Sequence, residues 1–158
     1  MRTLFLAAAL FAAPALAKAA EPVPPIAGRW ALDLSAMPVP PEARPKSVVI
    51  RFDSQAGNRL AMTVDILDAG GGTRHMGGSY TLDGSGAPIT GDLGEADIAA
   101  ARMPAPGLLV MALGKGGIPA STRVYSVSSD GGTMTETAVY FAEDGKPVLR
   151  TNRFTRIR

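Results

Sequence analysis

The chain has 158 residues, a formal net charge of +2, no cysteine and one histidine. The lack of cysteine excludes disulfide bonds, thiolate metal sites, a thiol nucleophile and a lipid-anchoring cysteine. A single histidine, His75, excludes metal sites built from several histidines and would have to serve any histidine-based triad.

Residues 1–20 have the three parts of a Sec-type signal peptide. Arg2 supplies the positive charge, residues 4–13 form a short apolar run, and Ala15-Leu16-Ala17 is a small-x-small cleavage pattern. The apolar run is shorter than the ~20 residues that span a bilayer. We therefore expect cleavage after Ala17 or within three residues of it, and a periplasmic or secreted mature protein.

Removal of this leader changes the charge of the chain. A cut after Ala20 takes away Arg2 and Lys18, so 16 basic residues become 14 against 14 acidic ones, and the net charge falls from +2 to zero. The high calculated pI therefore gives no support to nucleic-acid binding. The remainder, 158 minus 20 or 138 residues, has the size of one domain, which we expect over 28–158 after an extended lead-in at 21–27.

The first half of the mature chain reads as strands joined by turns. Trp30, Leu32 and Leu34 alternate with polar or small residues, and the four prolines within 35–45 predict a loop to the next strand. Apolar residues then alternate within 47–53, 60–66 and 76–82, and short glycine-bearing turns separate these segments. This pattern predicts an antiparallel meander with one apolar face.

The middle of the chain is less regular. Residues 83–94 are rich in turn formers, whereas 95–103 are rich in alanine and end before Pro104, which leaves a strand and a short helix both open. Residues 108–113 are apolar on both faces, as in a strand that is covered on two sides.

The last third predicts three sequential antiparallel strands over 122–128, 133–141 and 148–157, joined by Asp-Gly turns. The faces of these strands are more polar than those of the first half. Their larger polar side chains include Arg123, Tyr125, Tyr140, Arg150, Arg153 and Arg156.

Many short strands without a convincing helix predict an all-β fold, either a barrel or a sandwich. Gly28-x-Trp30 on the first strand and an arginine near the end of the last strand resemble the lipocalin and calycin barrels. The resemblance implies an up-and-down antiparallel barrel of eight to ten strands, with a tryptophan that plugs one end and a late arginine packed across its indole. In such a barrel the last strand pairs with the first, which leaves Arg153 or Arg156 as the partner of Trp30.

The chain is also similar to a group of small uncharacterised secreted bacterial proteins with a lipocalin-like body. The similarity lies in the order of several short motifs across nearly the whole mature chain. They are Gly-x-Trp, the proline-rich crossover, Pro88-Ile89-Thr90-Gly91-Asp92, Ser121-Thr122-Arg123, Asp130-Gly131 and Asp144-Gly145-Lys146-Pro147.

No group of residues predicts a catalytic, metal or cofactor site. His75 has the phase of the outer face if Met76 and Tyr80 point inward. The acidic residues Asp92, Glu95 and Asp97 do not have EF-hand spacing, so we expect a solvated loop there. The glycines of 114–117 lack the strand and helix that flank a phosphate-binding loop and predict a hairpin turn.

If the alternating residues of the predicted strands point inward as their pattern suggests, the barrel has a ligand-binding interior that is apolar on one side and polar on the other. Arg123 would pair with an anionic head group in this interior. An interior simply packed by apolar side chains, with the polar residues pointing outward, is equally compatible with the pattern. The candidate lining residues are Phe52, Met62, Val64, Tyr80, Arg123, Tyr125, Glu136 and Tyr140.

Three functional hypotheses follow from this pattern. The first is a non-catalytic periplasmic or secreted barrel that binds a small apolar or amphipathic ligand without a cofactor. The second is a packed structural or protein-interaction module, and the third and least favoured is an enzyme on a calycin-like scaffold. One tryptophan and a terminal Arg158 argue against insertion into an outer membrane, and the sequence leaves protein partners and oligomeric state open.

Overall fold

Eleven antiparallel strands form a single sheet in the computed structural model, which describes residues 23–37 and 39–158. Two 3₁₀ turns, η1 (Leu34–Ala36) and η2 (Pro41–Ala43), lie between the first two strands. The strands are β1 (Gly28–Leu32), β2 (Ser47–Gln55), β3 (Arg59–Leu67), β4 (Thr73–Thr81), β5 (Asp83–Pro88), β6 (Thr90–Gly91), β7 (Ile98–Ala105), β8 (Leu108–Lys115), β9 (Ile118–Val127), β10 (Thr133–Phe141) and β11 (Pro147–Ile157). The expected leader at 1–20 lies outside the described residues.

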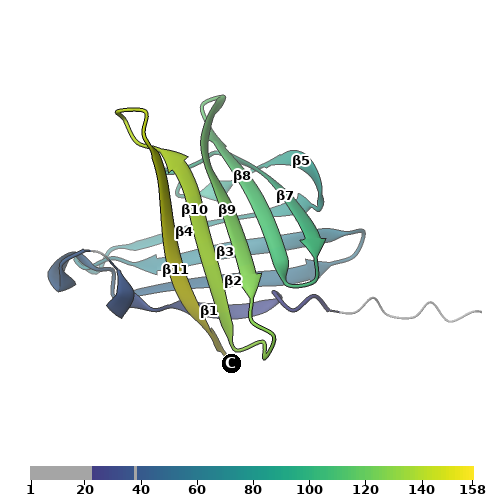
Figure 1. Ribbon diagram of the computed structural model, residues 1–158, viewed down its shortest axis with the longest axis horizontal. Coiled ribbons are helices and arrows are strands. Elements are labelled where there is room, and N and C mark those ends of the chain that lie inside the picture. Colours follow the sequence, from purple (N-terminus) through teal and green to yellow (C-terminus); the bar gives the residue numbers. More distant parts are fainter. Residues whose placement is uncertain (1–22, 38) are drawn as a thin grey trace, which may run out of the picture.

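The sheet curls into a nearly closed up-and-down barrel, as predicted. Its strand order is β5-β7-β8-β9-β10-β11-β1-β2-β3-β4-β6, so the first and last strands pair in the middle of the order. The two walls cross, with β1–β4 running across the view behind the upright β7–β11 (Figure 1). The arrangement is compatible with a calycin-like fold.

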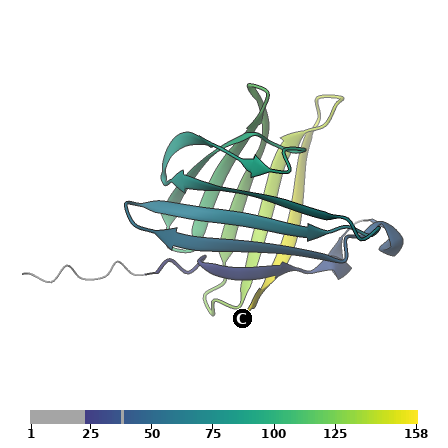
Figure 2. The ribbon, with the colours of Figure 1, turned by 180° about the vertical axis from the view of Figure 1, so that it is seen from behind.

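The barrel closes through residues 83–91, a stretch predicted to be turn-rich. Its first part, β5, pairs with β7, and its last part, β6, pairs with β4 through Met76 and Gly91. From behind, this stretch arches above β4 (Figure 2). Between the two parts Ile89 leaves both ladders and donates its N–H to the Asp97 carbonyl at 2.9 Å. This break divides one strand into two, so eleven strands are present where eight to ten were predicted.

The alanine-rich segment that was open between strand and helix is strand β7. Pairing with β5 and β8 outweighs the helix propensity of alanine. The small side chains of Ala99 and Ala101 point inward and are 1% and 2% exposed. Pro104 is tolerated because the register with β8 shifts between Arg102 and Ala105.

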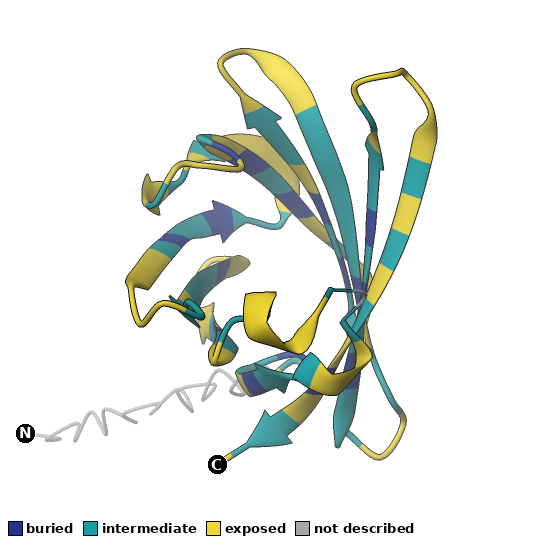
Figure 3. Cartoon of the chain, turned by 90° about the vertical axis from the view of Figure 1, so that its left-hand side faces the viewer, coloured by how far each residue is buried: buried dark blue, intermediate teal, exposed yellow. Residues whose placement is uncertain are grey.

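The turns between strands follow the predicted glycine signals. Gly116 and Gly117 have φ angles of 58° and 80° and connect β8 to β9. Positive φ at both central residues is the requirement of a type I′ hairpin turn, which glycine meets without steric cost. The glycines at 114–117 therefore form the hairpin that the sequence predicted. Hairpin tips are exposed, while buried positions lie on the walls (Figure 3).

Alternation along the strands places the apolar core inside the barrel. The large, fully buried side chains lie toward the end where β11 finishes. The ring of Phe52 meets that of Tyr125 edge to face, with centroids 5.5 Å apart. The fully buried side chains there are Ile26, Trp30, Phe52, Leu60, Leu109, Met134 and Phe154.

Trp30 and Arg156 close this end of the barrel. They are register partners on β1 and β11, and the Arg156 guanidinium carbon lies 4.1 Å from the centroid of the indole. Trp30 Nε1 donates to the Ile26 carbonyl at 2.8 Å. Gly28 has φ of 127°, and a Cβ there would lie 2.5 Å from Arg156 Nη1, so the Gly-x-Trp pattern leaves room for the arginine. We call this packed end the floor.

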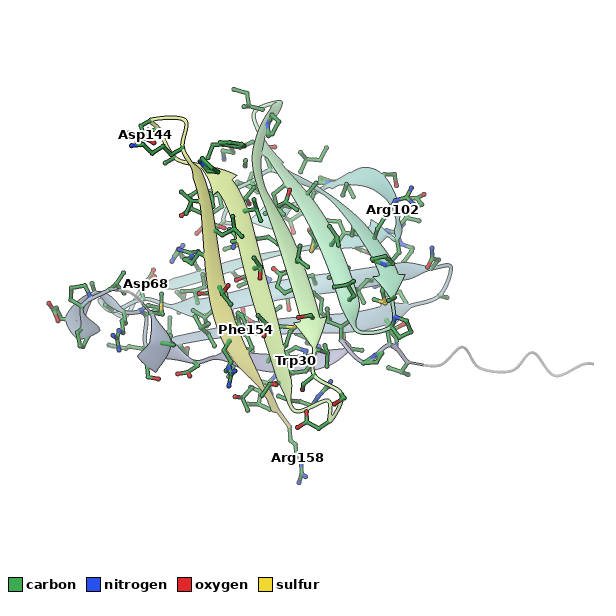
Figure 4. All side chains as sticks on the ribbon, viewed as in Figure 1. Trp30, Asp68, Arg102, Asp144, Phe154 and Arg158 are labelled. Atoms are coloured by element: carbon green, nitrogen blue, oxygen red, sulfur yellow. The ribbon has the colours of Figure 1, made fainter. Side chains whose placement is uncertain are left out.

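The opposite end carries the loops that surround the mouth of the barrel. It consists of the η1–η2 crossover, the β3–β4, β8–β9 and β10–β11 turns, and residues 92–97 between β6 and β7. In Figure 4, Asp68 and Asp144 mark two of these loops, away from Trp30 and Phe154.

Candidate functional site

Polar side chains line the inner wall of β9, β10 and β11 above the floor. Cross-strand register places Tyr125 beside Glu136, and Glu136 beside Asn152. One row nearer the mouth, Arg123 and Arg150 lie on either side of Ala138. The sequence hypothesis that one side of the interior is polar thus corresponds to two adjacent rows of side chains.

Glu136 is the buried charge of this wall, with 4% of its surface exposed. Its Oε1 accepts from Arg123 Nη1 at 3.0 Å and from the Tyr125 hydroxyl at 3.1 Å, and its Oε2 accepts from Asn152 Nδ2 at 2.6 Å. A buried carboxylate is tolerated when it is paired and hydrogen-bonded in this way. Burial, together with the negative charge of Glu136, raises the pKa of Tyr125 well above its usual value, so this hydroxyl stays a donor.

Arg123 connects the wall to a loop at the mouth. Its Nη1 reaches Glu136, its Nε donates to Ser121 Oγ at 3.2 Å, and its Nη2 donates to Glu95 Oε2 at 2.9 Å. Burial lowers the pKa of Arg123, but the charges of Glu136 and Glu95 more than offset this effect and raise it overall. Arg123 is therefore a fixed positive charge whose side chain is 12% exposed.

An apolar cavity of about 90 Å³ lies beside this cluster. Met76 and Met111 contribute to its wall, as do Glu95 and Arg123 at its polar border. Five of the proposed lining residues border it, namely Met62, Val64, Tyr80, Arg123 and Tyr125.

Two more open cavities lie toward the mouth and share Glu95 and Arg123 with the apolar one. The first, of about 290 Å³, is bordered by Ser121, Tyr140 and Arg150. The second, of about 330 Å³, extends under the η1–η2 crossover and is bordered by Glu136, Arg150 and Asn152. The Arg123–Glu95 pair therefore stands where all three spaces meet.

The remaining lining candidates have different surroundings. Glu136 and Tyr140 border the mouth cavities, as described above. Phe52 points inward but is wholly buried in the packed part of the barrel, against Tyr125. Of the two arginines considered for the floor, Arg156 lies over Trp30, whereas Arg153 is exposed and pairs in register with Thr135.

Three residues of the site were not singled out from the sequence. Arg150 was noted only as part of a basic strand, although it shares the inward phase of Phe154 and Arg156. Asn152 shares that phase as well. Glu95 was grouped with two other acidic residues, and no local signal indicated that it reaches Arg123. The alternation of side chains along β11 could have revealed Arg150 and Asn152. Once one residue of a regular strand is known to point inward, every second residue is expected to point inward as well.

Arg150 differs from its neighbours because one of its buried donors has no acceptor among the described residues. Its Nε is buried and has no hydrogen-bond acceptor within the described part of the chain. The two nearby carboxylates, Glu95 and Glu136, pair with Arg123 instead. A buried donor without an acceptor is uncommon in folded proteins and requires an explanation.

Of the other candidate groups from the sequence, His75, Asp92 and Asp97 do not border these cavities. His75 is on the outer face, where its Nδ1 lies 2.6 Å from Asp65 Oδ1 and both side chains are 63% exposed. The acidic residues of 92–97 take separate partners: Asp92 lies near Arg74, and Asp97 accepts from the Gly116 N–H at 2.8 Å. Among the described residues no three His, Cys, Asp or Glu side chains gather as metal ligands do.

Comparison with known proteins gives no match from which a function could be inferred. No protein-family model matches the chain, and no curated protein is similar enough in sequence to count as a relative. Within residues 23–37 and 39–158, no helix has the length and hydropathy needed to cross a membrane. What can be said about function therefore comes from the cavities and the charges beside them.

Proposed function

We propose that the protein is a non-catalytic periplasmic or secreted carrier of the calycin type, with a lipocalin-like body, which binds a small amphipathic ligand in its lumen. The observation that carries this proposal is the contact between an apolar cavity and a charged cluster at one point inside the barrel. Binding sites for small molecules typically combine apolar walls with a few convergent polar groups in this manner.

The proposed location follows from the amino-terminal sequence. Residues 1–20 combine a positive start, an apolar run and a small-x-small pattern, which are the parts of an exported leader. A cysteine-free chain is also indifferent to the redox state of the compartment in which it folds.

The volume of the apolar cavity limits the ligand. At about 90 Å³ it is smaller than the ~150 Å³ cavity that accepts a benzene ring. A compact apolar group fits this space, while a larger one would require Met62, Met76 and Met111 to move. Methionine side chains have three rotatable bonds and adapt more easily than other apolar residues.

The alternative is a packed structural or interaction module, and the floor favours it. Trp30, Phe52 and Phe154 lie at that end of the barrel and are 0%, 0% and 2% exposed. Large apolar residues also lie on the outer surface, where Ile118, Phe141 and Leu149 are 70%, 72% and 70% exposed. Exposed apolar side chains mark an interaction surface where they form a contiguous patch.

Native mass spectrometry of the protein purified from a periplasm separates the two proposals. The carrier proposal predicts a bound small molecule in wild type that is lost in Val64→Phe, because residue 64 borders the apolar cavity. Thr63→Phe is the matched control, since Thr63 pairs in register with Arg51 and Gly77 on the opposite face of β3. Circular dichroism should show the same fold for all three proteins.

The carrier proposal also predicts binding of an added apolar fluorescent probe. Wild type and Thr63→Phe should bind the probe, and Val64→Phe should not. A wild type that carries no small molecule and binds no probe would overturn the carrier proposal and favour the packed module.

A further inference from the structure

Arg123 and Arg150 face each other across a single small residue on the inner wall. Both are register partners of Ala138, Arg123 from β9 and Arg150 from β11. Adjacent strands are about 4.8 Å apart, so the two arginine backbones are separated by roughly 10 Å. Ala138 fills little of the space between them, because its side chain is one methyl group.

Arg123 and Arg150 differ in how many of their N–H donors form hydrogen bonds. Arg123 makes hydrogen bonds through Nε, Nη1 and Nη2, whereas Arg150 Nε is buried without an acceptor in the described part of the chain. Arg150 borders both mouth cavities, so an acceptor can approach its side chain from there, while Nε itself is shielded from solvent. The row thus places a positive side chain beside the open space, and one buried donor of that side chain has no acceptor in the described residues.

Glu95 indicates which kind of group the row accepts. Its carboxylate bonds to Arg123 Nη2, although Glu95 belongs to the mouth loop 92–97 and its side chain is 62% exposed. The other two acceptors of Arg123, Ser121 and Glu136, come from the barrel wall itself. Glu95 is therefore the one acceptor that a loop movement can withdraw, and it shows that a carboxylate fits beside Arg123.

The apolar cavity begins at the same place, because Glu95 and Arg123 are also part of its border. A molecule with its head group in this row can extend its apolar part toward Met62 and Met111. Guanidinium groups bind carboxylates through paired hydrogen bonds, which a neutral hydroxyl head group does not match.

We propose that Arg123 and Arg150 form a carboxylate-binding site across Ala138, and that the ligand is a compact apolar monocarboxylate whose head group displaces Glu95 from Arg123. This inference rests on the proposed carrier function and specifies its ligand class. Glu95 is an internal competitor in this site and sets the affinity for the incoming carboxylate.

Isothermal titration calorimetry of the mature chain tests the site. The ligands are straight-chain carboxylates from butyrate to dodecanoate and the primary alcohols of the same lengths. We expect the best carboxylate to bind about tenfold more tightly than its alcohol. Arg150→Met should remove this preference and leave alcohol binding unchanged, whereas Arg153→Met, on the exposed face of the same strand, should change neither.

Removal of the internal competitor gives an opposite effect. Glu95→Gln should tighten carboxylate binding several-fold, because the amide competes less well for Arg123 than a carboxylate does. Glu143→Gln is the matched control, since it removes the same charge from the exposed β10–β11 turn at the same end of the barrel. Equal gains in the two variants would indicate a general charge effect and would count against the proposed site.

The outcomes distinguish the two levels of the proposal. If carboxylates and alcohols bind equally and Arg150→Met has no effect, the head-group site is wrong while the carrier function stands. An alkyl phosphate that binds more tightly than the carboxylate of the same length also overturns the carboxylate assignment. If neither series binds and no apolar probe binds, the carrier function fails and the site fails with it.

Discussion

Strand β11 carries two inward arginines, one at each end of the lumen, and their surroundings differ sharply. At the floor, Arg156 donates to the carbonyls of Gly131, Ala27 and Pro25 at 2.7, 2.7 and 2.5 Å, and its guanidinium lies over Trp30. Near the mouth, Arg150 leaves a buried Nε without an acceptor in the described chain. The same residue type, on the same face of the same strand, donates from all three of its side-chain nitrogens in one place and has a buried nitrogen without an acceptor in the other.

The difference comes from what each end of the barrel places beside the strand. At the floor the amino-terminal lead-in and the β9–β10 turn bring main-chain carbonyls to the arginine, and these acceptors are fixed by the fold. Along the wall near the mouth, backbone carbonyls are occupied in the strand ladder, so an arginine depends on side chains or on a ligand. An inward arginine thus finds fixed main-chain acceptors where loops fold over it, and has a donor without an acceptor in the described chain where the lumen opens.

The largest expected effect tests the floor. Arg156→Gln removes three hydrogen bonds and the cation–π contact, so we expect a loss of about 2–4 kcal/mol in the free energy of unfolding. Arg153→Gln, three residues earlier on the exposed face, should change it by less than about 0.5 kcal/mol. Urea denaturation followed by the fluorescence of Trp30 measures both. Equal losses in the two variants would show that the floor contact does not have the role we assign to it.

A moderate effect is expected at Tyr125, where the two regions meet. Its ring packs on Phe52 of the floor, and its hydroxyl donates to Glu136 of the polar wall. Tyr125→Phe keeps the ring and removes the hydroxyl, so we expect a loss of about 1–2 kcal/mol at neutral pH.

The stabilisation by the Tyr125 hydroxyl is expected to depend on pH, and the direction follows from its raised pKa. Burial and the charge of Glu136 raise the pKa of Tyr125 in the folded state, while in the unfolded chain it is about 10. The stabilisation is therefore complete below about pH 10 and is lost as the pH rises above it, because only the unfolded form releases the proton. Urea denaturation at pH 7 and above pH 10 should show the gap between wild type and variant shrinking. A constant gap would contradict a protonated, buried Tyr125.

The part of the fold that could be predicted is the part in which each strand carries its own signal. Alternation marked β2, β3, β4 and the last three strands, because residues of contrasting polarity occupy opposite faces. Residues 83–91 consist largely of glycine, serine and alanine, which show little contrast between faces. Their strand character comes from pairing with β4 and β7, which is tertiary information. The same reason explains why the alanine-rich β7 was ambiguous.

The alternation of side chains along the strands predicted only part of the candidate site. Phase suggested that Arg123, Tyr125 and Glu136 share the interior, and the structure brings these three into direct contact. The acceptor on the other side of Arg123 comes from a loop, Glu95, whose position depends on the closure of the barrel. The missing partner of Arg150 is likewise a property of the assembled lumen, which sequence periodicity does not encode.

The smallest expected effect on stability is at Arg150, and it tests the contrast with Arg156 directly. Arg150→Met keeps an unbranched apolar side chain as far as the position of Nε and removes the guanidinium, whose buried Nε has no acceptor in the described chain. Burial removes Arg150 Nε from water, and no hydrogen bond in the described chain compensates for this cost. Its removal should therefore leave the free energy of unfolding unchanged or raise it by up to about 1 kcal/mol. Thermal denaturation beside Arg156→Gln measures the contrast. A loss at residue 150 as large as that at residue 156 would mean that Arg150 supports the fold, because an arginine kept for binding contributes nothing to stability until its carboxylate partner is present.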